Sequence, residues 1–265
     1  MSLSGVCLGA VSAAGRLHNA TAAEVARGHD HLLLSIAANV AQTLILVGVF
    51  YLFSILTGFG TAMVRGDLLI YLITGVCMFN LHIRAMGAVL SGGRIGAQND
   101  AAHPGLAASA LACLYVQAYS IAIVAGAYHV FIKSFSIDDA AGLAIAFILC
   151  WLSGVGAGLI FLSAKGVFPR LSALAAQAYS RFNMIGSGQM FVANMLPAHV
   201  LVYFKWNPLF HLIDQARGFA FLNYSPWFSN MWYPAAATGV LLVVGLLARN
   251  SSAGQGAASA GPGKP

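Results

Sequence analysis

The sequence contains few charged residues. Only 8% of its 265 residues are charged, and Asp and Glu together number 7. A soluble domain typically carries about 25% charged residues, which keep its water-facing surface in solution. With 59% hydrophobic residues and so little charge, the sequence excludes a soluble globular protein and predicts one that lies in a lipid bilayer.

The sequence also lacks the pattern of a membrane β-barrel. Barrel strands alternate apolar and polar residues over about ten positions, whereas the apolar stretches here are continuous and exceed the roughly 18 residues that indicate a transmembrane helix. Because lipid offers no hydrogen bonds to the backbone, only helices or closed barrels can span a membrane. The predicted fold class is therefore an all-α polytopic membrane protein.

Motifs for common catalytic chemistry are missing. The sequence has no G-x-x-x-x-G-K-[ST] phosphate loop, no H-E-x-x-H motif and no G-x-S-x-G elbow. Its four cysteines form no C-x-x-C pair, which favours buried apolar thiols over a metal or redox site. We expect no catalytic residue, no cofactor, no metal and no nucleic-acid partner. The first 30 residues are too polar to supply the apolar core of a signal peptide.

Six apolar segments divide the chain. We predict transmembrane helices over residues 32–58, 68–90, 105–132, 140–164, a fifth segment, and 232–248. The fifth segment covers 171–196 or begins near Phe182, and Pro197 ends it in both cases.

The ends of the chain differ from its apolar centre. Residues 1–31 form a cytoplasmic or interfacial segment, in which the capping-box pattern Thr21-Ala-Ala-Glu24 predicts a short helix; a disordered tail is the alternative. Residues 32–248 form the six-span domain, and residues 249–265, rich in Gly, Ala and Ser, form a flexible cytoplasmic tail.

The stretch 197–233 does not fit a single span, because charged residues interrupt it at Lys205, Asp214 and Arg217. Two short helices at the membrane surface, or a re-entrant hairpin, fit better. Asn207-Pro208 predicts the start of the second helix, with Asn as the N-cap and Pro at the first helical position.

Spacing along this second helix, which we place at 207–221, brings two pairs of side chains together. His211 and Gln215 are four residues apart and share one side, and Asp214 can pair with Arg217 at i, i+3 spacing.

The distribution of basic residues predicts the orientation. Six spans put both termini on the same side, and we place that side in the cytoplasm. The inside would then hold Arg16, Arg27, Arg84, Arg94, Lys165, Arg170, Arg249 and Lys264, and the outside Arg65, Lys133, Lys205 and Arg217. This excess of inside basic residues agrees with the positive-inside rule.

The C-terminal third carries a family resemblance. Residues 206–214 read Trp-Asn-Pro-Leu-Phe-His-Leu-Ile-Asp, followed by Arg217, Tyr224 and Tyr233-Pro234. This segment resembles the permease subunits of ABC-2-type exporters, in particular those that export capsular polysaccharide or lipopolysaccharide O-antigen. The resemblance implies six spans, an N-terminal interfacial helix, and re-entrant helices between spans five and six in the inner (plasma) membrane.

The resemblance also implies partners. Such permeases act with a second copy of themselves and a separate ATPase subunit, and they contact membrane lipid and a glycan substrate. Their loop between spans two and three holds a coupling helix that touches the ATPase. In this chain the loop covers 91–103, and the implied coupling residues are Arg94, Ile95, Gln98, Asn99 and Asp100.

Two further groups of residues follow from the same resemblance. The re-entrant or gate residues are Trp206, Asn207, Pro208, His211, Asp214 and Arg217. They would guide an emerging sugar chain, or form a plug that satisfies its own polar groups. Aromatic rings can stack on sugars, so a conduit would use Tyr115, Tyr119, Tyr179, Phe182 and Phe191. Packing or lipid-facing roles are the alternative for these rings.

Small residues in span four predict a close helix contact, because Gly154, Gly156 and Gly158 let a neighbouring backbone approach; ordinary use of glycine in membrane helices is the alternative.

For function, two alternatives to a glycan exporter stay open. One is an ABC-2-type exporter of a drug or other small hydrophobic molecule, and the other is a membrane enzyme or assembly factor that transports nothing.

Overall fold

The computed structural model describes residues 29–57, 68–95 and 104–259. These residues form eight α-helices and one 3-10 turn, and no strand occurs among them. The helices are α2 (His29–Thr57), α3 (Leu68–Ile95), α4 (Pro104–Phe131), α5 (Ala140–Val167), α6 (Pro169–Gly186), α7 (Ala198–Leu201), α8 (Pro208–Ala220) and α9 (Trp232–Ser259). The all-α prediction is confirmed, whereas residues 1–28 lie outside the described residues.

Five of the described helices, α2, α3, α4, α5 and α9, are long and apolar enough to cross a membrane. The sixth predicted span is different. In place of a helix ending at Pro197, α6 ends at Gly186 and has 18 residues. At a rise of about 1.5 Å per residue it reaches roughly 27 Å, short of a hydrocarbon core of about 30 Å, and it includes Arg170 and Arg181.

A glycine turn explains why α6 stops early. Gly188 has a φ of 70°, a left-handed conformation that only glycine adopts without steric strain. The apolar residues that follow, including Met190, Phe191 and Val192, therefore belong to an irregular segment. The prediction of 171–196 counted these residues as a continuation of the helix, which is wrong.

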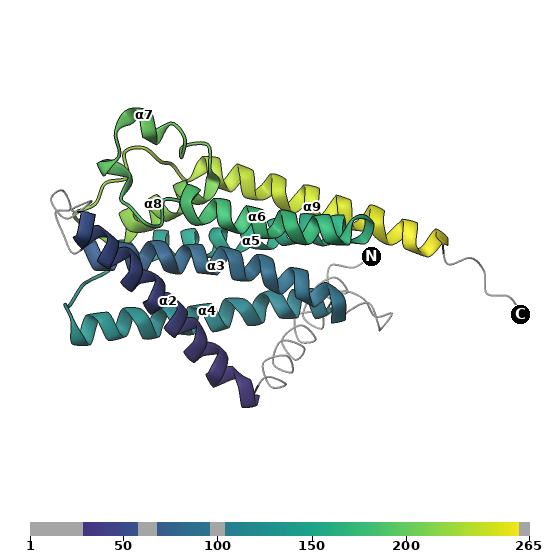
Figure 1. The fold of residues 1–265 in the computed structure, drawn as a ribbon, viewed down its shortest axis with the longest axis horizontal. Coiled ribbons are helices and arrows are strands. Elements are labelled where there is room, and N and C mark those ends of the chain that lie inside the picture. Colours follow the sequence, from purple (N-terminus) through teal and green to yellow (C-terminus); the bar gives the residue numbers. More distant parts are fainter. Residues whose placement is uncertain (1–28, 58–67, 96–103, 260–265) are drawn as a thin grey trace, which may run out of the picture.

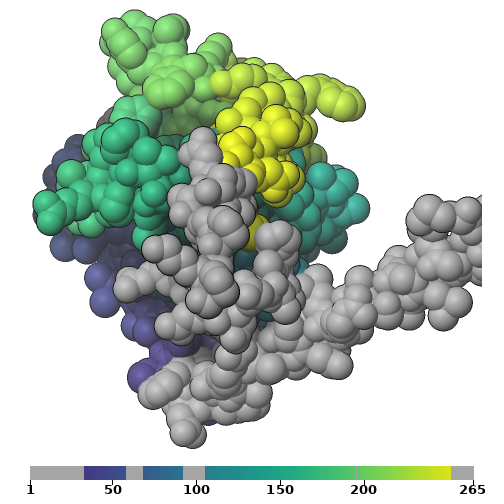
Figure 2. All heavy atoms as spheres, turned by 90° about the vertical axis from the view of Figure 1, so that its right-hand side faces the viewer, coloured from purple at the N-terminus to yellow at the C-terminus, as the bar shows by residue number. Residues whose placement is uncertain are grey.

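Helices α3 and α5 form the centre of the bundle. Helix α5 packs against α3, α6, α8 and α9, while α3 also contacts α2 and α4. In Figures 1 and 2, α2 (purple) and α9 (yellow) lie on opposite sides of this centre. The outer helices expose large apolar side chains, such as Leu33, Phe131 and Val240. Such continuous apolar surface is expected where helices face lipid.

The three glycines of α5 lie at close helix contacts. A Cβ built on Gly158 would stand 2.8 Å from the carbonyl oxygen of Met86 in α3, and one on Gly156 would stand 2.9 Å from the Cβ of Leu241 in α9. A Cβ on Gly154 would meet the carbonyl oxygen of His82. The predicted tight contact is confirmed, and it has two sides, because alternate glycines face different helices.

Two helices extend beyond their predicted ends. Helix α3 continues to Ile95 instead of ending near residue 90. Helix α9 continues to Ser259, past the predicted start of a flexible tail at residue 249. No proline interrupts this extension, and the first proline after α9 is Pro262.

Candidate functional site

The segment between α6 and α9 forms one polar network at the end of the bundle where α7 and α8 lie (Figure 1). Helix α8 begins as predicted. The side-chain oxygen of Asn207 accepts a hydrogen bond of 3.0 Å from the backbone N–H of Leu209, and Pro208 occupies the first helical position. The Asn207 amide nitrogen donates to the side chain of Asn183 and to the carbonyl of Gly186, at 3.0 and 2.8 Å. Asn207 thus ties the start of α8 to the end of α6.

Arg217 is the most extensively bonded residue of the network. Its side chain is 1% exposed. The guanidinium donates to four backbone carbonyls, those of Tyr71, Gly188, Phe191 and Gln189, at 3.2, 3.3, 2.8 and 3.1 Å. Three of these carbonyls belong to the turn after α6, and the fourth belongs to α3. Arg217 therefore holds α8, α3 and the Gly188 turn together.

Asp214 bonds to hydroxyl groups. Its carboxylate accepts hydrogen bonds from the hydroxyls of Tyr224 and, at 2.7 Å, Ser229. Burial raises the pKa of this carboxyl, while the two hydrogen bonds and the charge of Arg217 lower it. Asp214 and Arg217 thus interact through their charges, as their spacing predicted, but their hydrogen bonds go to different partners.

His211 and Gln215 face the same segment, as their spacing predicted. The Nδ1 of His211 accepts from the backbone N–H of Asn230 at 3.1 Å, and Gln215 donates to the Ser229 hydroxyl at 2.9 Å. Because Nδ1 is an acceptor, the proton lies on Nε2, which donates to the carbonyl of Lys205 at 2.6 Å. This neutral histidine bridges the segments on both sides of α8.

The opposite side of α8 is apolar. Leu212, Ile213 and Ala216 pack with Met78 of α3 and Cys150 of α5 in one buried cluster. Helix α8 is therefore held by apolar packing on one side and by hydrogen bonds on the other. Its polar groups are satisfied within the fold.

The aromatic residues predicted for a conduit are not brought together. Tyr115 and Tyr119 lie exposed on α4. Tyr179 contacts His82, the ring of Phe182 lies 5.6 Å from that of Trp206, and the ring of Phe191 lies 4.9 Å from that of Phe204. None of the five lines either of the two cavities described below.

The coupling residues are placed only in part. Arg94 and Ile95 belong to the last turn of α3. Gln98, Asn99 and Asp100 lie outside the described residues. One end of the bundle, away from α8, contains the C-terminal ends of α3 and α5 and the N-terminal ends of α4 and α6 (Figure 1).

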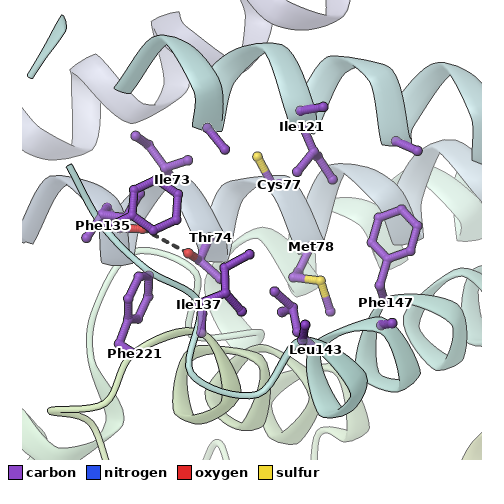
Figure 3. Close-up of a pocket in the computed structure, with 17 residues that line it drawn as sticks. Ile73, Thr74, Cys77, Met78, Ile121, Phe135, Ile137, Leu143, Phe147 and Phe221 are labelled. Atoms are coloured by element: carbon purple, nitrogen blue, oxygen red, sulfur yellow. Dashed lines mark hydrogen bonds between the residues drawn. The ribbon is translucent and has the colours of Figure 1, made fainter. Parts of the chain in front are cut away.

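An apolar cavity of about 380 Å³ lies between α3, α4 and α5 near the start of α5 (Figure 3). Its lining includes Ile73, Cys77, Ile121, Phe135 and Leu143. The hydroxyl of Thr74, which also lines it, donates to the carbonyl of Ile70 at 2.9 Å. The cavity therefore suits an apolar molecule and offers little polar recognition.

One buried network was not predicted. His82 of α3 hydrogen-bonds through Nδ1 to Ser153 of α5 at 2.7 Å and through Nε2 to Tyr179 of α6 at 2.9 Å. The Ser153 hydroxyl donates to the carbonyl of Cys150, so His82 donates from Nδ1 and accepts the Tyr179 hydroxyl at Nε2. The only sequence signal was a histidine inside an apolar span, since its partners are 71 and 97 residues away.

Comparison with protein-family models and with curated proteins gives no match to this chain. Within the described ranges, no three or more His, Cys, Asp or Glu side chains gather in a way that could hold a metal ion.

Proposed function

We propose that this chain is the membrane-spanning permease subunit of an ATP-driven exporter of the ABC-2 type. It would move a polysaccharide or a lipid-linked glycan across the inner membrane, as a homodimer with a separate ATPase. The observation that carries the proposal is the α8 unit. The residues that bear the resemblance, from Trp206 to Pro234, fold into one compact, capped and internally hydrogen-bonded unit between the last two long helices.

The orientation of the proposed permease is supported by charge at the two ends of the bundle. Lys165, Arg170 and Arg249 lie near the end away from α8. Asp138, Lys133 and Lys205 lie at the other end, so the imbalance depends on the basic residues of the whole sequence, eight on the first side and four on the second. Under the positive-inside rule, the first end faces the cytoplasm, and α8 lies near the outer surface, where a re-entrant helix would meet an emerging glycan.

Cysteine labelling tests this orientation. In a background with Cys7, Cys77, Cys113 and Cys150 replaced by serine or alanine, we expect Asp138→Cys to react with a membrane-impermeant maleimide in intact cells. Lys165→Cys should react only after permeabilisation. The reverse pattern would place α8 on the cytoplasmic side and contradict the proposal.

Coupling to an ATPase is the central functional test. In the proposed permease the end of α3 transmits movement of the ATPase to the spans by rigid-body motion. We expect the gently solubilised chain to co-purify with an ATPase subunit, and Arg94→Ala/Ile95→Ala to lower glycan export. Lys133→Ala, at the opposite end of the bundle, is the matched control. Export that is unchanged in the double variant would remove this loop from the mechanism.

The apolar cavity favours a second candidate function, export of a small hydrophobic molecule. A volume of about 380 Å³ falls in the range of small-molecule sites and its lining is apolar. Deleting the gene distinguishes the two functions. Loss of surface glycan supports the first, whereas unchanged glycan with greater sensitivity to hydrophobic drugs supports the second.

A further inference from the structure

A second cavity, of about 470 Å³, lies between α2, α3 and α4 and is unlike the apolar one. We call it the polar pocket. Its lining is mostly apolar, but it includes four polar side chains: Ser35 and Asn39 from α2, Arg84 from α3, and Gln117 from α4. All three helices are candidate membrane spans. A polar cavity inside apolar spans requires an explanation, because polar groups in hydrocarbon are costly.

Arg84 brings a positive charge to the polar pocket. Its guanidinium donates to the side-chain oxygen of Gln42 at 2.5 Å. Gln42 is neutral, and across the described ranges no carboxylate is found in an ion pair with Arg84. Charged residues within membrane spans are rare, and they usually have a partner or mark a functional site. Among the described residues the charge of Arg84 therefore has no neutralising carboxylate, and an anionic ligand would supply one.

Asn39 and Gln117 supply a second, independent observation. Each side chain is 3% exposed. The oxygen Oδ1 of Asn39 and the nitrogen Nε2 of Gln117 are buried without a hydrogen-bond partner in the part of the chain that the structure describes. Most buried polar atoms are paired, and an unpaired one costs free energy. The pocket thus contains a cation, an unused donor and an unused acceptor.

These three groups define a ligand. Arg84 and Gln117 can donate to phosphate oxygens, which favour guanidinium partners, and Asn39 can accept from a hydroxyl. We propose that the polar pocket binds a phosphodiester with a nearby hydroxyl, as in a glycerol phosphate head group. A carboxylate or a bare phosphodiester would leave Asn39 unpaired, and a choline head group would put a second cation beside Arg84.

The surroundings favour a ligand with hydrocarbon tails. Ser35 of α2 and Gly87 of α3 are exposed at the rim of the pocket, and α2 carries exposed Leu44 and Ile45 farther toward the middle of its span. A lipid can therefore place its tails along α2 while its head group enters between the helices. The site does not depend on the proposed transport function, because a polytopic protein of any activity could hold a lipid in this way.

Native mass spectrometry of the purified full-length chain tests the proposal. The chain would be exchanged into detergent with phosphatidylglycerol, phosphatidylethanol or phosphatidylcholine at equal concentrations. We expect retention of phosphatidylglycerol to exceed that of phosphatidylcholine about tenfold, or roughly 1.4 kcal/mol, because choline puts a second cation beside Arg84 and offers no hydroxyl to Asn39. Phosphatidylethanol, a phosphodiester without a hydroxyl, should fall between them. Equal retention of all three lipids overturns the proposal without any variant.

Variants assign the contacts. Arg84→Gln should make phosphatidylethanol and phosphatidylcholine equivalent and leave only the smaller preference for phosphatidylglycerol that Asn39 gives, whereas Arg84→Lys should keep most of the original preference. Asn39→Leu should make phosphatidylglycerol and phosphatidylethanol equivalent while both remain above phosphatidylcholine. Arg181→Gln, at an exposed arginine of α6, is the control. A preference of phosphatidylethanol over phosphatidylcholine that survives Arg84→Gln places the lipid elsewhere and overturns the assignment.

Competition distinguishes the source of the phosphate. If soluble glycerophosphoglycerol, the deacylated phosphodiester of phosphatidylglycerol, displaces the lipid at millimolar concentration, the head group alone accounts for binding, and the natural ligand is a soluble phosphodiester. If it does not, the tails contribute and the ligand is a lipid. Both results support the proposed chemistry. Displacement by inorganic sulfate to the same extent would show a charge-only site and contradict the role given to Asn39.

Discussion

Replacing Arg217 with methionine provides the sharpest test of the α8 network. Methionine keeps much of the length of the side chain but removes the charge and every donor. Four carbonyls then lose the guanidinium, and three of them lie in the irregular turn after α6. The carboxylate of Asp214 also loses the nearby positive charge that favours its ionised form.

The expected cost follows from burial. Hydrogen bonds to a charged group contribute about 1.5–3 kcal/mol each in favourable cases, but contributions in one network do not add. Removing one partner from a buried charge arrangement costs about 3–5 kcal/mol. For a chain of this size about 1 kcal/mol lowers Tm by roughly 2–4 °C. We therefore expect Arg217→Met to lower the melting temperature by about 10 °C.

Thermal unfolding of the purified chain in detergent, followed by the fluorescence of a thiol-reactive dye, measures this shift. Arg181→Met is the matched control, because Arg181 is an exposed arginine on the neighbouring helix α6. It should change the melting temperature by no more than about 1–2 °C, as surface substitutions usually do. Equal melting temperatures for Arg217→Met and the control would refute the view that Arg217 organises this end of the bundle.

Three further predictions test other contacts. Gly158→Ala should destabilise the chain by about 1–3 kcal/mol because its Cβ meets α3. Gly126→Ala, where the Cβ meets nothing within 4 Å, should stabilise the chain by roughly 0.5–1 kcal/mol. Changes of the same sign in thermal unfolding would contradict the close contact at Gly158. Asn207→Asp keeps the cap but sets a carboxylate against two acceptors, so its melting temperature should fall below that of Asn207→Ser at neutral pH, and the gap should narrow at acidic pH as the carboxyl protonates. Tyr179→Phe should cost about 0.5–1.5 kcal/mol through the lost bond to His82, while Tyr115→Phe should cost nothing measurable; equal effects would argue against the His82 network.

The features that could be predicted from sequence are local ones. Long apolar runs identify spans without knowledge of their neighbours, and this worked for the five long helices. The start of α8 could be predicted equally well, because an Asn-Pro pair acts on the backbone within three residues. The glycines of α5 predicted a close contact, but they did not identify the two helices that make it.

The features that could not be predicted depend on residues distant in sequence. Arg217 bonds to Tyr71 across 146 positions, and His82 finds its partners on two later helices. No periodicity encodes such pairings. The predicted length of α6 was wrong for another reason. Apolar residues continue past Gly188, so only the backbone conformation of that glycine reveals the turn.

The contacts of α8 also bear on the choice between a gate and a plug. Movement of α8 alone would break the four Arg217 bonds, the Asn207 bonds to α6 and the apolar packing on α3 and α5. Movement together with the Gly188 turn and the segment that follows α8 would keep three of the four Arg217 bonds and both bonds of Asp214, because Gly188, Gln189, Phe191, Tyr224 and Ser229 would travel with it. The bonds that join this unit to the rest of the bundle include those to Tyr71, Asn183, Gly186 and Asp139. If this end of the protein opens during export, the arrangement therefore favours rigid-body displacement of the whole segment over unwinding of α8.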